Sequence, residues 1–224
     1  MVMEFFKGGS DIPLEEIESL IVQMLQDDRH TFDLAINALL GGTDANVVGK
    51  EVKKSDKRVN RAEREVRRRL IVHAAVAGER VDLTRVLIAM SVIKDAERVG
   101  DQCKNIWDLA NEGIDLSAAE DLKWLLSMRD QTSRFISEAS RIYQERDSEA
   151  AHTMIGEMDE AQDRFDECVV AQIESTATAR DAVPRALLCR YLKRITSHLM
   201  NVVTSLVMPL ERLDYYDEKK ADRD

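Results

Sequence analysis

The chain of 224 residues carries 32 basic and 42 acidic side chains, giving a formal net charge of -10, and 44% of its residues are hydrophobic. This length and apolar content allow a substantial core in one large domain or two small ones. The negative charge argues against a general nucleic-acid binder, because phosphate backbones repel an acidic protein.

Six long helices are predicted. Glycine and proline are scarce, with 9 and 3 copies, and apolar residues recur every three or four positions between them, which is the period of an amphipathic helix. The first expected helix begins near Asp11 and Pro13, a cap followed by a first-turn proline, and stops at Gly41. The second continues to about Gly78 and the third runs from Val81 to about Gly113. The other three cover about residues 118–146, 148–178 and 183–213. No segment competes as a strand, and helices of such length joined by short turns form elongated antiparallel bundles.

A basic run from Lys50 to Arg69 lies in the second predicted helix. Acidic residues are interspersed along it, so we interpret the run as a solvated helix face. It therefore does not predict a nucleic-acid surface.

The two halves of the chain repeat one pattern. The segments Asp56–Val66 and Asp159–Val169 share an Asp, an Asn or Asp, an Arg, an acid and a Val in register. A weaker match relates the third predicted helix to the sixth. We therefore expect an all-α fold of two tandem, pseudo-repeated three-helix bundles, over residues 1–115 and 116–214, followed by a polar tail over residues 215–224.

The sequence favours a cytoplasmic protein. No stretch approaches the roughly 18 apolar residues that a membrane span requires, and the apolar part of the N-terminus is too short for a signal peptide. The cysteines Cys103, Cys168 and Cys189 are odd in number and form no CxxC pair. This argues against a disulfide framework and a thiolate zinc site, and a reducing compartment fits best.

Acidic side chains interrupt the predicted core face of the second and third helices. Asp56 and Glu63 lie on the same stripe as the valines of the second helix, and the i, i+4 pair Glu97 and Asp101 continues the apolar stripe of the third. Burying an unpaired carboxylate costs several kcal/mol. Each of these groups must therefore be protonated, paired with a base, or neutralised by a cation.

Two interpretations of these acids are open. In one, the stripes turn toward solvent, or Lys94, Arg98 and Lys104 pair with the acids. In the other, the acids of the two neighbouring helices share a metal ion, and Gly100, which lies between Glu97 and Asp101, allows close approach. Oxygen ligands without His or Cys favour magnesium, manganese, calcium or iron.

A longer run makes the second interpretation more specific. The segment Asp95–Ile106, DAERVGDQCKNI, resembles the "LERIGD…NI" signature of PhoU proteins, and Asp56–Glu63 resembles the acidic motif on that family's preceding helix. The resemblance implies two three-helix bundles, E(D)xxxD motif pairs that bind metal ions, and negative regulation of phosphate uptake through a phosphate transporter and its sensor kinase. These partners would be met at the cytoplasmic membrane face, by a protein that is not an enzyme and that forms a homodimer or another homo-oligomer.

By motif match, Asp56, Asn60, Glu97 and Asp101 inherit the first metal site, with Glu63 as a weaker addition. The implied cofactor is a divalent or trivalent ion with oxygen ligands: iron, manganese, magnesium, calcium or zinc.

The second half departs from this pattern. Asp159 and Asp163 preserve the acidic pair, but Lys193 and Ser197 stand at the positions that match Glu97 and Asp101. An ammonium group there repels a cation and can itself neutralise one of the acids. We therefore expect a degenerate second site in which a salt bridge replaces the metal. His198, one residue further along, is interpreted as a surface or packing residue and not as a ligand.

Three alternatives remain. An accessory protein of a single-component phosphate permease would share the same bundle architecture. A ferritin-like di-iron oxidase needs two Glu-x-x-His motifs, and the chain has only one, from Glu149 to His152. A metal-free helical scaffold would make the acids incidental. No glycine-rich phosphate loop and no catalytic Ser/His/Asp or Cys/His set is recognisable, so the sequence offers no candidate for catalysis.

Overall fold

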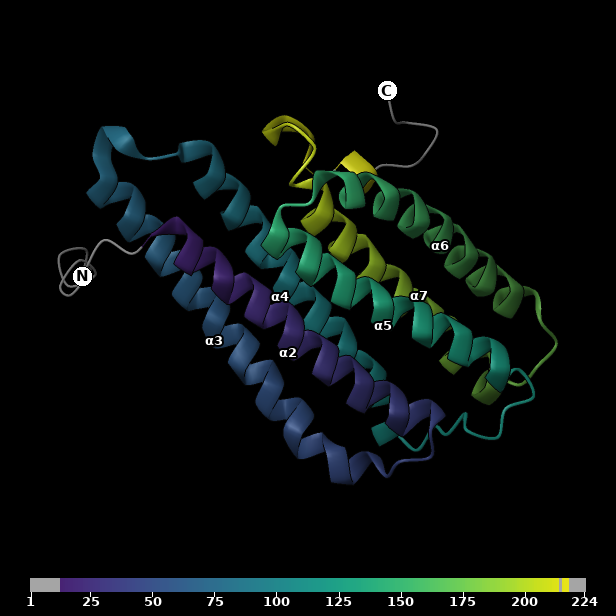
Figure 1. Ribbon diagram of the computed structural model, residues 1–224. Coiled ribbons are helices and arrows are strands. Elements are labelled where there is room, and N and C mark those ends of the chain that lie inside the picture. Colours follow the sequence, from purple (N-terminus) through teal and green to yellow (C-terminus); the bar gives the residue numbers. More distant parts are fainter. Residues whose placement is uncertain (1–12, 214, 218–224) are drawn as a thin grey trace.

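The computed structural model of the protein describes residues 13–213 and 215–217. The six long helices are α2 (Leu14–Leu40), α3 (Ala45–Ala77), α4 (Leu83–Asn111), α5 (Leu122–Glu145), α6 (Ser148–Glu174) and α7 (Ala179–Thr204). Short 3-10 turns, η1 (Gly78–Arg80), η2 (Leu210–Arg212) and η3 (Tyr215–Asp217), complete the order, and these parts of the chain contain no strand. The predicted all-α fold of six long helices is confirmed, and Figure 1 shows them as elongated rods lying side by side.

Aspartates define where three of the helices begin. The side chains of Asp44, Asp82 and Asp147 accept hydrogen bonds from backbone N–H groups in the first turns of α3, α4 and α6. Each such cap satisfies a donor that the helix itself cannot pair, and is worth about 1 kcal/mol. The predicted stops at Gly78 and Gly113 are also confirmed, because both glycines have positive φ and follow the ends of α3 and α4 closely.

The last helix differs from its predicted range of about 183–213. It begins at Ala179, four residues earlier, and contains Pro184 inside its second turn. It ends at Thr204, whose hydroxyl group bonds the carbonyl of Leu213. Pro209 follows after four more residues and disfavours a longer helix, because it lacks an N–H and disfavours helical geometry in the residue before it. The expected cap at Asp11 lies outside the described residues.

One hydrophobic core joins the two halves. Helices α2, α3 and α4 all pack against one another, α6 packs along α7, and α4 packs against α7 across the middle of the molecule. Helix α5 packs more extensively on α2 than on its sequence neighbour α6 (Figure 1). The buried rings of Phe32, Phe135 and Phe165 come from three different helices, and each contributes about 1.5–3 kcal/mol by leaving water. The division into residues 1–115 and 116–214 stays a prediction, since the core is continuous across it.

Helices α5 and α6 make little contact with each other. An open groove of about 390 Å³ lies between them, with Ile142, Ala150 and Met154 among its lining residues. An ion pair joins Arg134 of α5 to Glu157 of α6, and both residues line this groove. Along the chain that the structure describes, no helix is both long and apolar enough to cross a membrane.

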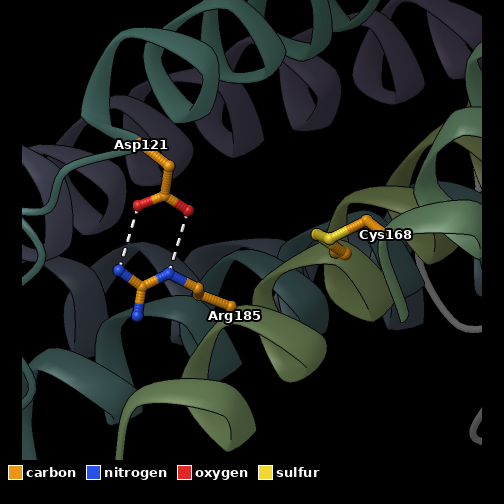
Figure 2. Close-up of a disulfide and its surroundings, with 4 residues drawn as sticks. Asp121, Cys168 and Arg185 are labelled. Carbon is orange, nitrogen blue, oxygen red and sulfur yellow. Dashed lines mark hydrogen bonds and ion pairs between the residues drawn. A yellow bond between two sulfur atoms is a disulfide. The ribbon is translucent and has the colours of Figure 1, made fainter. Parts of the chain in front are cut away.

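The expectation of no disulfide is wrong. Cys168 of α6 and Cys189 of α7 are bonded, with their Cα atoms 6.3 Å apart (Figure 2). Counting cysteines and looking for CxxC spacing could not detect this pair, because the two residues meet only when α6 folds back along α7. Cys103 remains a buried free thiol. The cysteine pattern therefore no longer supports a reducing compartment.

A bidentate ion pair lies near the disulfide. Arg185 of α7 donates two hydrogen bonds of 2.9 Å to the carboxylate of Asp121, the residue that precedes α5 (Figure 2). This parallel geometry is the strongest that an arginine and a carboxylate can form. The pair connects the start of α5 to α7.

Candidate metal centre

The antiparallel packing of α3 on α4 brings the predicted acids to one face of the first three helices. Glu63 and Glu97 are each only 8% exposed. Asp56, Asn60 and Asp101 are partly buried beside them. The acids therefore do interrupt a buried helix face, as the apolar stripes predict.

Basic side chains pair with these acids. The Nζ atom of Lys94 lies 2.6 Å from a carboxylate oxygen of Glu97 and 3.7 Å from one of Glu63. Arg98 reaches Asp101 at 3.3 Å through its Nη1 atom. A further pair of 3.7 Å joins Lys104 to Asp56. The first interpretation of the acids, that nearby bases neutralise them, therefore describes this arrangement.

The negative charges still affect one another. Burial raises the pKa of Asp101, and the nearby charge of Glu97 raises it further, while Arg98 acts in the opposite direction. The amide nitrogen of Asn60 is used within its own helix, where it donates to the backbone carbonyl of Asp56. The Asn60 side chain thus keeps an oxygen, the atom that a hard cation prefers, for another partner.

Sequence reasoning missed Asp28, the most deeply buried acid of this region. Its side chain on α2 is 0% exposed, and neither carboxylate oxygen has a hydrogen-bond partner. Burial raises its pKa well above the ordinary value, and the charges of Asp27, Glu97 and Asp101 add to the effect. A signal was available, because Asp28 lies midway between the buried Met24 and Phe32 at four-residue steps, on the core stripe of its helix.

Gly100 allows α2 and α4 to approach closely at this point. A Cβ atom built on Gly100 would lie 2.6 Å from the Oδ1 atom of Asp28, closer than any real side chain tolerates. Gly100 lies between Glu97 and Asp101 in the sequence of α4. Gly100 therefore does allow a close approach, and the group that approaches it is the carboxylate of Asp28.

The carboxylate and amide oxygens of these residues are ligands that suit an oxygen-preferring cation. In this arrangement, however, they are not gathered around a single position. Among residues 13–213 and 215–217, no three His, Cys, Asp or Glu side chains are grouped closely enough to hold a metal ion. The unpartnered oxygens of Asp28 and the gap at Gly100 fit such an ion, because a buried carboxylate needs a neutralising charge. A cation would bind here only if Lys94 and Arg98 released Glu97 and Asp101.

The corresponding acids of the second half have a different environment. Asp159 is partly buried and Asp163 is exposed on α6, and both make interactions with other groups. Lys193 forms an ion pair with Asp166, the residue that matches Glu63 in the repeat. This partner differs from the sequence prediction, in which Lys193 neutralises Asp159 or Asp163.

His198 is a packing residue that joins the two halves. It is 8% exposed, and its Nδ1 atom lies 2.9 Å from Oδ1 of Asp95 on α4. The amide of Asn201 donates to the same oxygen at 3.2 Å. Glu149 and His152, which carry the Glu-x-x-His motif, are both exposed on α6.

Comparisons with known proteins agree on one family. Residues 21–110 match the family model described as the PhoU domain, a range that contains Asp28 and all the first-half acids named above. The solved crystal structure of PhoU from Pseudomonas aeruginosa is similar with a TM-score of 0.73 at 20% identity, over 89% of this chain and 96% of that chain. No curated protein matches the sequence.

Proposed function

Since this chain carries a PhoU domain, we propose that it regulates phosphate uptake and phosphate-starvation signalling through protein contacts and without catalysis. The observation that carries the proposal is the domain match over residues 21–110, which coincides with α2, α3 and α4. The likeness of the whole fold to PhoU supports it, because the second half is also arranged as in that structure. At the family level, PhoU proteins are non-enzymatic regulators of phosphate uptake.

The proposed partners are components of a phosphate transporter and its sensor kinase, met at the cytoplasmic face of the membrane. The acidic net charge of -10 supports protein partners over nucleic acid. The protein is proposed to act as a negative regulator. None of the described helices is long and apolar enough to span the membrane itself.

We also propose that a hard cation binds on the first three helices. Glu97 and Asp101 of α4 would hold it together with Asp56 and Asn60 of α3, and Glu63 is a weaker candidate. When bound, such an ion would neutralise carboxylates from two helices and so tie α3 to α4. The acids of the second half, Asp159 and Asp163, are proposed to bind weakly or not at all, because Lys193 lies on their face.

Deleting the gene tests the regulatory function. The deletion strain should take up phosphate faster than its parent and express phosphate-starvation genes in phosphate-replete medium. Restoring the gene should reverse both changes. Unchanged uptake and unchanged starvation expression would refute the proposal. A change confined to strains with a single-component phosphate permease would assign the protein to that transporter.

Elemental analysis of protein purified without chelator tests the cation site. The double variant E97A/D101A should lose most of the bound metal, whereas D159A/D163A should retain it. Helical content, measured by circular dichroism, should be equal in both. Equal metal loss from both variants would show that the second site is not degenerate, and no loss from either would return the acids to simple ion pairing.

A further inference from the structure

Asp28 is a buried acid whose carboxyl group has no hydrogen-bond partner. Its side chain is 0% exposed, its carboxylate lies against Gly100 of α4, and neither oxygen accepts a hydrogen bond. The neighbouring acid Asp27 differs completely, because it is partly exposed and bonds Arg58 at 3.2 Å. A carboxylate in an apolar setting needs a proton, a base or a cation to neutralise it. No base among the described residues forms an ion pair with Asp28.

The Asp28 carboxylate points at the acidic segment of α4. Its Oδ1 atom occupies the space that a side chain at position 100 would need, 2.6 Å from the ideal Cβ position of Gly100. Gly100 is flanked by Glu97 one helical turn earlier and by Asp101 immediately after it. The charges of Glu97 and Asp101 both act on Asp28. The Asp28 carboxylate thus faces the segment of α4 that carries Glu97 and Asp101, at the one position of that segment that has no side chain.

The basic side chains of this region form ion pairs with other acids and not with Asp28. Lys94 and Arg98 lie on the outer side of α4, where they contact Glu97 and Asp101 at 2.6 and 3.3 Å. Both basic side chains are about half exposed, with 40% and 46% of their surface accessible. Only the basic partner of each pair is well exposed, so Lys94 and Arg98 can turn toward solvent and a cation with several oxygen ligands can take their place.

We propose that Asp28 is a further carboxylate of the cation site on the first three helices, contributed by α2 through the gap at Gly100. This inference rests on the proposed cation site and adds a ligand from a helix that the acidic motifs do not include. The ligand class is a hard divalent cation, because carboxylate oxygens alone supply the charge. Binding would then neutralise the buried carboxylate and connect all three helices of the first half.

The rival explanation is that Asp28 simply carries a proton. Asparagine distinguishes the two, because it has the shape of a protonated aspartate but cannot supply a negative charge to a cation. If Asp28 is only a protonated core residue, the variant D28N binds cations as the unaltered protein does. If Asp28 is a ligand, D28N binds them less tightly.

Titration of the full chain with Mn²⁺, followed by calorimetry and by the electron paramagnetic resonance of bound Mn²⁺, tests the proposal. D28N should weaken Mn²⁺ binding about 10- to 100-fold, the range seen when groups that support a metal are removed. The matched control D27N removes the adjacent charge on the same helix and should change the affinity less than about threefold. Circular dichroism should show equal helical content in all three proteins.

A second variant keeps the test decisive if D28N folds poorly. G100A places a methyl group against Asp28 without removing any carboxylate, and should also weaken Mn²⁺ binding about tenfold or more. Unchanged affinity in a folded D28N or in G100A would overturn the role of Asp28. If E97A/D101A loses Mn²⁺ while D28N keeps it, only this inference fails. If E97A/D101A also keeps Mn²⁺, or the unaltered protein binds none, the proposed cation site fails with it.

Discussion

His198 of α7 and Asp95 of α4 are joined by a buried contact of 2.9 Å across the two halves of the chain. Arg194 lies 3.3 Å from the other ring nitrogen, Nε2 of His198. A guanidinium group can only donate, so Nε2 must accept, and the neutral ring donates its Nδ1–H to Asp95. This tautomer fits all the surrounding groups, because Asp95 then also accepts from Asn201.

Removing either partner of this contact should destabilise the protein. D95A leaves the buried Nδ1–H of His198 unsatisfied, and H198A leaves a buried carboxylate with fewer donors, so each should lower the free energy of unfolding by about 1–3 kcal/mol. Urea denaturation measures the loss. The double variant should lose less than the sum of the single losses. Additive losses would mean that the two side chains do not act as a pair.

Two glycines in helices should respond oppositely to alanine. G100A introduces a clash with Asp28 and should cost about 1–3 kcal/mol of unfolding free energy. G156A on α6 meets no atom within 4 Å and should stabilise the helix by about 0.5–1 kcal/mol, because alanine restricts the unfolded chain and favours helix. Thermal melting compares the two. A stabilised G100A would contradict the close approach of Asp28.

The disulfide should contribute measurably to stability. Cys168 and Cys189 are separated by 21 residues, and closing a loop of that size is worth about 3 kcal/mol in the chain-entropy description. The variant C168A/C189A should therefore unfold at lower urea concentration than the oxidised protein. Thiol counting under denaturing, non-reducing conditions should find one free thiol, from Cys103. Three free thiols in protein purified under air would contradict the bond.

The ion pair between Asp121 and Arg185 should make stability depend on pH in the acid range. The hydrogen bonds from Arg185 lower the pKa of Asp121, and burial opposes this lowering only in part. Because the folded-state pKa is below the unfolded one, the stabilisation is present above the unfolded pKa and is lost as the pH falls through the folded value. The contribution should be below about 1 kcal/mol, since the pair is partly exposed.

Urea denaturation of D121N across the acid range checks this prediction. The variant should lose less stability than the unaltered protein as the pH falls. A variant that follows the same pH dependence would show that Asp121 contributes nothing to it.

Local features of the sequence predict the helices and their ends. The features that were not predicted depend on contacts between helices. Gly78 and Gly113 are predictable as helix stops because positive φ is a local property. The inward acids Glu63 and Glu97 are predictable because the helical period alone places them on an apolar stripe. The predicted start of the last helix near residue 183 is four residues too late, because Pro184 is tolerated within the second turn of α7.

Contacts between distant helices could not be predicted in this way. The bond between Cys168 and Cys189 and the pairing of His198 with Asp95 depend on which faces meet, and no local period reports that. Asp28 is an intermediate case. The period of α2 places it in the core, but only the packing of Gly100 shows which group it approaches.

The rate of phosphate uptake in a deletion strain carrying variants of the gene tests the regulatory role of the first-half acids most directly. We predict that the unaltered gene and D159A/D163A both return uptake to the parental rate, whereas E97A/D101A, made at the same protein level, leaves it elevated. Uptake that does not differ between the deletion strain and its parent, or that E97A/D101A restores as fully as the unaltered gene, would contradict it.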